Sequence, residues 1–371
     1  MWPIYDEPMP MLPPYRISAR VGILSETVNY NHALLNIPEL WESTKGGGVN
    51  VAILDTGLPR HIDIKPAGHR PDDIKACQDE NGHATHVGGI IAAISDNDIG
   101  VQGVAPNCRD FYFRALGADG SGSINNVIRG IHWAVDVIGA KVINLSLGIP
   151  AEVQLLPRLE QACQYALEQG CTIICAAGNE AGSIGQPACY AGVITVAAVD
   201  RNKKHAWFSN IGPQVDFAAG GIQVYSTWLN NTYARLDGTS MATPAITGLV
   251  ALVLAKHNRS TGKWMSPSEV YDLLKSVAVD VGPTGYDDQF GYGIPVLHYD
   301  NNSHNIEKDQ QELVECPAGG DRTGTSTGER LGETLKCAAE GLKLGDSTAK
   351  FITKVCEQWL AAEPAHENNP E

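Results

Sequence analysis

Between residues 49 and 300 the chain alternates short β-branched runs with helical patterns of small or amphipathic composition, and this alternation restricts the fold most. Parallel strands need long crossover connections, usually helices, so such alternation is typical of a mostly parallel sheet with helices on both faces. We therefore predict an α/β fold. The expected strands are residues 49–55, 110–116, 141–147, 171–177 and 192–199, and the expected helices are residues 84–94, 124–139, 153–169 and 241–257.

The bulk composition narrows the classes of protein that remain. With 371 residues, 43% of them hydrophobic, the chain can bury a large core. The net charge of −15 argues against a nucleic-acid partner or an anionic membrane surface, because both are approached by basic patches. The first residues carry proline and acid instead of a secretory signal, and the nine cysteines show no disulfide-like spacing. We therefore expect a cytoplasmic protein with reduced thiols.

Changes in composition along the chain predict four parts. Residues 1–20 form an N-terminal extension, and residues 21–300 form the main domain. A polar, acidic segment that ends in Gly, Thr and Ser is expected to be a linker over residues 301–328. Apolar residues at helical spacing then predict a small helical hairpin and tail over residues 329–371.

Polar side chains follow three of the expected strands. Asp55 ends the first, Ser146 follows "VINL", and Asn179 follows "IICAAG". Because open α/β sheets place their sites at the carboxyl ends of their strands, we expect these three residues at one edge.

Ser240 lies at the start of an apolar helix, and two interpretations of its hydroxyl compete. A serine there can cap free N–H groups, which is its commoner role. It can also act as a nucleophile, which requires a base and an acid that orients the base. His83, in "NGHATHVGG", is the candidate base, and small residues follow it on a helix that other backbone can approach closely. His86 is expected to be structural.

Three motifs, "VAILDTG", "GHATHVGG" and "GTSMATP", resemble in that order the catalytic signatures of the subtilisin family of serine peptidases. The chain order Asp, His, Ser is the known order of that family. The resemblance covers about residues 35 to 297 and implies a serine endopeptidase that works through an acyl-enzyme on Ser240. It further implies that His83 is the general base and acid, that Asp55 orients it, and that Asn179 contributes to the oxyanion hole.

The same resemblance implies a binding site for a peptide or protein substrate. Glycines are expected where an extended substrate pairs with the enzyme's backbone. Glu180, near the base of the specificity pocket, would allow a basic side chain beside large ones. The implied substrate-binding residues are Gly120, Ser121, Gly122, Ser146, Leu147, Gly148, Gly178, Glu180 and Gly185.

Calcium is the implied cofactor, because "AISDNDIGVQGVAP" resembles the family's calcium loop. Oxygen ligands suit this hard cation. The loop is one residue longer than usual, which leaves its register around residues 96–98 open. The implied ligands are the side-chain oxygens of Asp63 and Asn97 and the carbonyls of Ile94, Ile99 and Val101.

Within the family the front of the chain is most similar to the intracellular subtilisins. "LPPY", residues 12–15, resembles an element that lies across the active site in those enzymes. Proline lacks an N–H and has a fixed φ, which spoils productive strand pairing, so such a segment can bind without being cut. This implies a zymogen trimmed between Pro14 and about Val21, and the resemblance also allows a homodimer.

Two other functions stay open at this point. One is a catalytically silent scaffold that binds a peptide. The other is a dedicated protease that removes one leader peptide. The intact set of Asp55, His83, Ser240 and Asn179 argues against the first, and broad digestion of casein would argue against the second.

Overall fold

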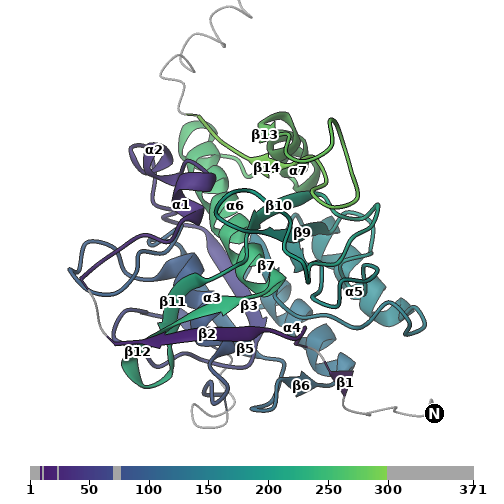
Figure 1. Ribbon diagram of the computed structural model, residues 1–371, viewed down its shortest axis with the longest axis horizontal. Helices are drawn as coiled ribbons and strands as arrows, with labels where there is room; N and C mark the ends of the chain where they lie inside the picture. Colours follow the sequence, from purple (N-terminus) through teal and green to yellow (C-terminus); the bar gives the residue numbers. More distant parts are fainter. Residues whose placement is uncertain (1–8, 11, 23–24, 70–76, 299–371) are drawn as a thin grey trace, which may run out of the picture. The chain divides into compact units, whose positions relative to one another are not determined.

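The computed structural model describes residues 9–10, 12–22, 25–69 and 77–298. A seven-stranded parallel sheet lies at the centre of this region (Figure 1), which confirms the predicted fold class. Its strands, in spatial order, are β10 (Phe217–Gly220), β9 (Ile194–Val199), β8 (Thr172–Ala176), β7 (Val142–Leu145), β3 (Asn50–Asp55), β5 (Arg109–Arg114) and β4 (Gly68–His69). The calls on residues 1–8 and 301–371, the linker and helical hairpin included, lie outside the described residues.

Crossover helices cover both faces of the sheet. The helix α3 (His83–Ala92) lies between β4 and β5 in the chain, α4 (Ile124–Asp136) lies between β5 and β7, and α5 (Pro157–Glu168) lies between β7 and β8. The helix α3 packs against α6 and α4 packs against α5, and α5 and α6 both contact β8, so the two pairs cover the two faces of the sheet. The long helix α6 (Thr239–Thr261) packs beside α3 and runs over β7, β8, β9 and β10.

The structure contains a second sheet that the sequence analysis does not predict. It is antiparallel, in the order β11 (Val224–Trp228), β12 (Thr232–Asp237), β2 (Arg16–Val21), so β2 pairs with a strand more than two hundred residues later in the chain. The remaining elements are short: β1 (Met9–Pro10) pairs with β6 (Ser121–Gly122), β13 (Ala278–Val279) pairs with β14 (Ile294–Pro295), and α1 (Asn31–Leu34), α2 (Ile37–Trp41), η1 (Leu229–Asn231) and α7 (Pro267–Ser276) complete the described part.

The helix α6 forms much of the core. Its residues from Thr239 to Ala255 are all buried, and Gly248 lies so close to Val104 that an added Cβ would come within 2.6 Å of that side chain. By length and composition this helix could span a membrane, but its most apolar window is 94% buried inside the fold. It is therefore a core helix of the described domain.

Two of the predicted helices start two or more residues away from the predicted position. The helix expected from residue 153 starts at Pro157, because proline fits the first helical position but not the interior. The first helical residue of α6 is Thr239 instead of residue 241, so Pro244 lies in its second turn. At that depth its missing N–H deprives the carbonyl of Ser240, four residues earlier, of its helical donor. The hydroxyl of Ser146 donates to this carbonyl instead, at 3.1 Å.

Candidate active site

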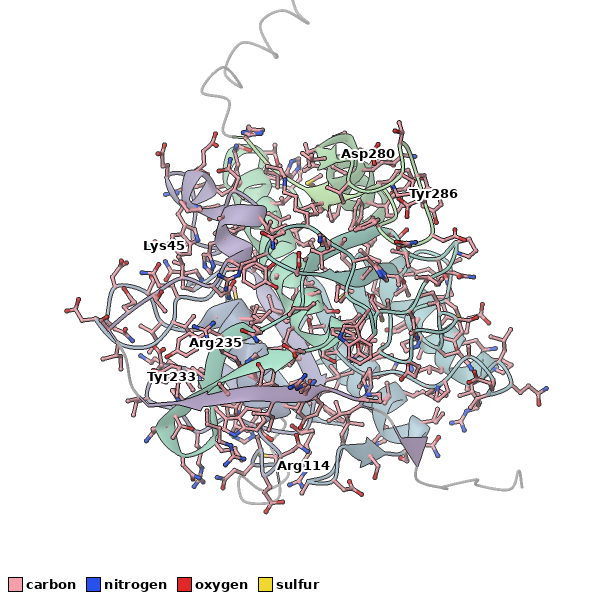
Figure 2. The ribbon with its side chains drawn as sticks, viewed as in Figure 1. Lys45, Arg114, Tyr233, Arg235, Asp280 and Tyr286 are labelled. Carbon is pink, nitrogen blue, oxygen red and sulfur yellow. The ribbon has the colours of Figure 1, made fainter. Side chains whose placement is uncertain are left out.

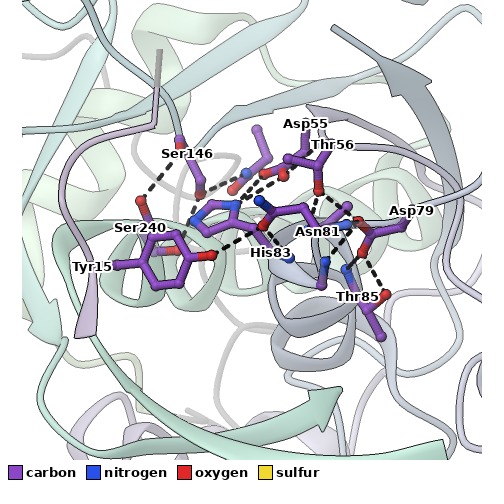
Figure 3. Close-up of polar contacts among 12 residues, drawn as sticks. Tyr15, Asp55, Thr56, Asp79, Asn81, His83, Thr85, Ser146 and Ser240 are labelled. Atoms are coloured by element: carbon purple, nitrogen blue, oxygen red, sulfur yellow. Dashed lines mark hydrogen bonds and ion pairs between the residues drawn. The ribbon is translucent and has the colours of Figure 1, made fainter. Parts of the chain in front are cut away.

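The buried pair of His83 and Asp55 lies at the carboxyl edge of the sheet, where β3 ends and α3 begins (Figure 3). His83 Nδ1 lies 2.8 and 2.9 Å from the two carboxylate oxygens of Asp55, and neither residue is exposed. A carboxylate accepts only, so Nδ1 carries the proton and Nε2 presents a lone pair. Among the described residues Nε2 has no hydrogen-bond partner. The imidazole is therefore held in the tautomer that a general base requires.

A second buried carboxylate, Asp79, holds the start of α3 in place. It accepts the hydroxyl of Thr56 at 2.8 Å and both the N–H and the hydroxyl of Thr85, at 2.8 and 2.6 Å. The Thr56 hydroxyl also accepts the N–H of Ala84, the residue after His83. These contacts tie the strand that carries Asp55 to the helix that carries His83. The sequence analysis missed Asp79 and Thr56, although Asp79 lies only four residues before His83.

Ser240 lies at the first turn of α6, but its hydroxyl does not cap the helix. The N-cap is Gly238, and the Ser240 hydroxyl donates to the Ser146 carbonyl at 3.1 Å. The capping interpretation of Ser240 is therefore wrong. The backbone N–H of Ser240 is one of those that the first turn leaves without a helical acceptor.

Asn179 is oriented by the residue before Ser240. Its Oδ1 accepts the N–H of Thr239 at 2.8 Å and the hydroxyl of Thr239 at 2.7 Å, which directs Nδ2 outward as a donor. That Nδ2 donates to the carbonyl of Pro14 at 2.9 Å. A side-chain amide aimed at a peptide carbonyl next to a free helix N-terminus can stabilise an oxyanion there.

The segment of residues 12–15 lies over this site. The N–H of Leu12 donates to the carbonyl of Gly120, and the backbone just before it, β1, pairs with Ser121 and Gly122 in β6. The ring of Tyr15 packs on the imidazole of His83, with centroids 5.1 Å apart, and its hydroxyl donates to Asn81 (Figure 3). Burial and the nearby charges of Asp55 and Asp79 raise the pKa of Tyr15, so its phenol stays neutral.

A pocket of about 230 Å³ beside this segment is lined by Gly148, Gly178, Glu180 and Gly185, together with Leu12, Pro13 and Pro14. Gly178 has a φ of +104°, and a Cβ there would lie 2.3 Å from the Asn210 amide, so glycine is required. The Glu180 carboxylate accepts the N–H of Asn179 and the amide of Asn210, both at 2.9 Å. The side chain of Leu147 is instead buried in the core, so only its backbone can reach a substrate.

The loop predicted to bind calcium surrounds the buried carboxylate of Asp63. This carboxylate accepts the amide of Asn97 at 2.7 Å and the N–H of Val101 at 3.0 Å, and the N–H of Ile94 donates to the Asp63 carbonyl at 2.9 Å. The N–H of Ile99 donates to the Asn97 side chain. Desolvation raises the pKa of Asp63.

Glu26, which the sequence analysis missed, reaches the same loop. Its carboxylate accepts the N–H of Asn97 at 3.1 Å and the amide of Gln102 at 2.7 Å, and its charge contributes to the raised pKa of Asp63. No composition or periodicity signal marks Glu26, because it is brought to the loop by the path of residues 25–29.

His86 is structural, as predicted. Its Nε2 lies 3.1 Å from the carbonyls of both Val224 and Ala234, and complete burial lowers its pKa to about 3. The neutral ring therefore connects α3 to the second sheet.

Comparison with known proteins decides what this arrangement is. The model of the Subtilase family, Peptidase_S8, matches residues 46–293. The chain belongs to the subtilase family. It is 40% identical over 278 residues to subtilisin DY of Bacillus licheniformis, an alignment that covers 72% of this chain and 96% of that protein. It is 43% identical over 243 residues to subtilisin Savinase of Lederbergia lenta, covering 64% of this chain and 86% of the other.

An alkaline protease of Alkalihalobacillus alcalophilus is 44% identical over 271 residues, covering 72% of this chain and 68% of that protein. The chain is a subtilisin-like serine endopeptidase, and the buried His83–Asp55 pair agrees with the catalytic apparatus of such an enzyme.

Proposed function

We propose that this subtilase cleaves peptide bonds through an acyl-enzyme on Ser240, with His83 and Asp55 completing the triad. The observation that carries the proposal is the buried Nδ1–carboxylate pair, which leaves Nε2 as the acceptor for a hydroxyl proton. The Ser240 oxygen bonds to the substrate carbonyl carbon as its proton passes to Nε2, and His83 then returns that proton to the leaving amine. Water then attacks the acyl-enzyme in the same way and releases the carboxylic acid half of the substrate.

A fluorophosphonate probe tests this assignment directly. It should label the wild type on Ser240 and should not label Ser240→Ala. Labelling of both proteins would place the nucleophile elsewhere, and labelling of neither would favour the silent scaffold.

Asn179 is proposed as the side-chain donor of the oxyanion hole, with the backbone N–H of Ser240 beside it. We expect Asn179→Leu to lower kcat by roughly 10²–10³-fold with little change in KM, the loss known for the corresponding change in a subtilisin. The reason is that charge develops on the carbonyl oxygen only in the transition state. A mainly raised KM would instead assign Asn179 to ground-state binding.

Residues 12–15 are proposed as an inhibitory segment that makes the protein a zymogen. The support is the bond from Asn179 to the Pro14 carbonyl and the Tyr15 ring on His83, which together cover the base and the oxyanion donor. Proline at two successive positions removes the N–H groups that productive pairing uses. Cleavage between Pro14 and about Val21 is the proposed activating step.

Deletion of residues 1–18 should raise casein turnover by roughly tenfold or more. A tethered segment competes at an effective concentration of the order of millimolar, which exceeds ordinary substrate concentrations. The comparison uses the full chain under identical conditions. Equal turnover by the two proteins would remove the inhibitory role.

Calcium is proposed as a stabilising cofactor at the loop around Asp63. The donor chemistry fits, because the carboxylates of Asp63 and Glu26 and the amide of Asn97 gather hard oxygens there, and no ion pair of a described residue compensates Asp63. Asn97 directs its amide nitrogen toward Asp63, so its side chain would rotate to offer oxygen. The cation would supply the missing positive charge.

Chelation of calcium should lower Tm by roughly 5–10 °C at pH 8, because a ligand at a hundred times its Kd contributes about 2.7 kcal/mol. Without metal, the raised pKa of Asp63 favours folding below its ordinary value of 3.8, and this contribution is lost as pH rises through the raised folded value. The chelation effect should therefore shrink on acidification. Asp63→Asn should abolish it at pH 8, and an unchanged effect in that variant would place the ion elsewhere.

Three further properties are proposed: the compartment, the side-chain preference and the oligomeric state. Thiols without a disulfide suit a cytoplasmic, reducing compartment, and they are found at Cys108, Cys163, Cys171, Cys175 and Cys189. The pocket lined by Glu180 suits large side chains and offers a carboxylate to a basic one. The homodimer rests on the resemblance to intracellular subtilisins, and sedimentation of the full chain tests it.

A further inference from the structure

The strand β12 meets β2 along its outer edge, and the pairing shows how a chain can continue past the active site. β2 is antiparallel to β12, with Arg16 opposite Asp237 at one end and Val21 opposite Tyr233 at the other. Figure 1 shows β2 lying along β12, and Figure 2 labels Tyr233 and Arg235 of β12 above that strand. The outer edge of β12 thus pairs with a segment that runs away from the catalytic residues.

The position of this pairing relative to the reacting centre follows from Pro14. Its carbonyl accepts the Asn179 amide, so Tyr15 takes the place of the first residue on the leaving-group side. Arg16 and Ile17 are then the second and third such residues, and they pair with Asp237 and Leu236. The ladder continues through Ala19, Arg20 and Val21, well beyond the residues that touch the triad.

The pairing of β2 with β12 contains a β-bulge at Ser18. Ile17 pairs with Leu236 and Ala19 pairs with Arg235, so Ser18 is the extra residue. The Ser18 hydroxyl donates to the Arg235 carbonyl at 2.8 Å, so the extra residue binds β12 through its side chain. A hydroxyl-bearing residue is therefore favoured at the fourth place past the cleaved bond.

The edge of β12 places few requirements on the side chains of the strand that pairs with it. Arg16, Ile17 and Arg20 are exposed, whereas Val21 packs against the small apolar cluster that contains Tyr225 and Tyr233. Main-chain pairing of this kind gives affinity with little sequence preference, as in other strand-addition modes of peptide binding.

We propose that the outer edge of β12, Tyr233–Asp237, is a leaving-group subsite that binds an extended, unfolded polypeptide as an added antiparallel strand. It becomes available when β2 detaches, and it favours long unfolded chains over short peptides. The proposal rests on the proposed function of the N-terminal segment, because β2 occupies the outer edge of β12 until that segment detaches. The polypeptide bound at this edge is the leaving-group side of the same substrate chain that passes Ser240.

The test uses quenched fluorescent peptides with one common acyl half and a leaving half of two to seven residues. The enzyme is the full chain carrying Ala19→Pro and Arg20→Pro. Successive residues of an antiparallel strand point their N–H groups alternately toward and away from the partner, so this pair removes at least one ladder donor of β2. The matched control carries Ala19→Ser and Arg20→Ala, which change side chains but keep both N–H groups.

We expect the proline variant to outpace wild type and control on casein, and its kcat/KM to rise about tenfold from three to seven leaving residues. N-methylation of alternate leaving residues should remove this gain in one alternating set and spare it in the other. Replacement of Ser by Ala at the fourth leaving residue should cost part of the gain.

The outcomes separate the two proposals. A proline variant that is faster on casein but shows kcat/KM independent of leaving-half length overturns the subsite and leaves the inhibitory segment standing. If neither this variant nor the deletion of residues 1–18 is faster than wild type, the inhibitory role fails, and the length series on the uninhibited wild type decides the subsite. If the proline variant does not fold by its melting curve, the N-methyl series on the chain that lacks residues 1–18 decides it.

Discussion

Ser240→Ala should lower kcat on a peptide substrate by about 10⁶-fold, the size known for loss of the nucleophile in a subtilisin. The substituted residue keeps its place at the start of α6, where the hydroxyl makes no capping bond, so the helix should form as before. The loss is chemical, because without the oxygen no acyl-enzyme forms. Burst kinetics with an active-site titrant and steady-state kcat provide the measurements.

Ser260→Ala is the matched control, since it removes a hydroxyl from the exposed end of the same helix. It should leave kcat within a factor of about two, as is usual for surface substitutions. A residual activity of Ser240→Ala within tenfold of wild type would contradict the assignment of the nucleophile.

Asp55→Asn should lower kcat by about 10⁴-fold, the size known for the same change in another serine protease. An amide can donate its N–H to Nδ1 of His83, which moves the ring proton to Nε2 and removes the lone pair that accepts the Ser240 proton. Substrate binding uses other groups, so KM should change little. The measurement is kcat and KM on one peptide substrate over pH.

The control for this change is Asp272→Asn, an equal loss of charge on α7, where no catalytic group lies. It should retain wild-type kcat. A loss below tenfold in Asp55→Asn would mean that the carboxylate is not needed to orient the imidazole.

The fold class could be predicted because its signal is local. Buried parallel strands appear as continuous apolar runs, and crossover helices must lie between them, so five strands and four helices were found from residues close together in sequence. The strands β10 and β4 and the whole second sheet were missed. Short strands such as Phe217–Gly220 carry few β-branched residues, and the partner of β2 lies more than two hundred residues away.

The sequence by itself determined the candidates for the reacting groups, since the three motifs propose Asp55, His83 and Ser240 by residue type and order. Only the tertiary structure decided where their polar atoms point. The Ser240 hydroxyl turns to the Ser146 carbonyl, the Tyr15 ring covers His83, and a serine hydroxyl replaces the N–H that Pro244 lacks. Each of these contacts joins residues far apart in the chain, and hydrogen-bond direction and ring packing depend on distances that sequence order does not set.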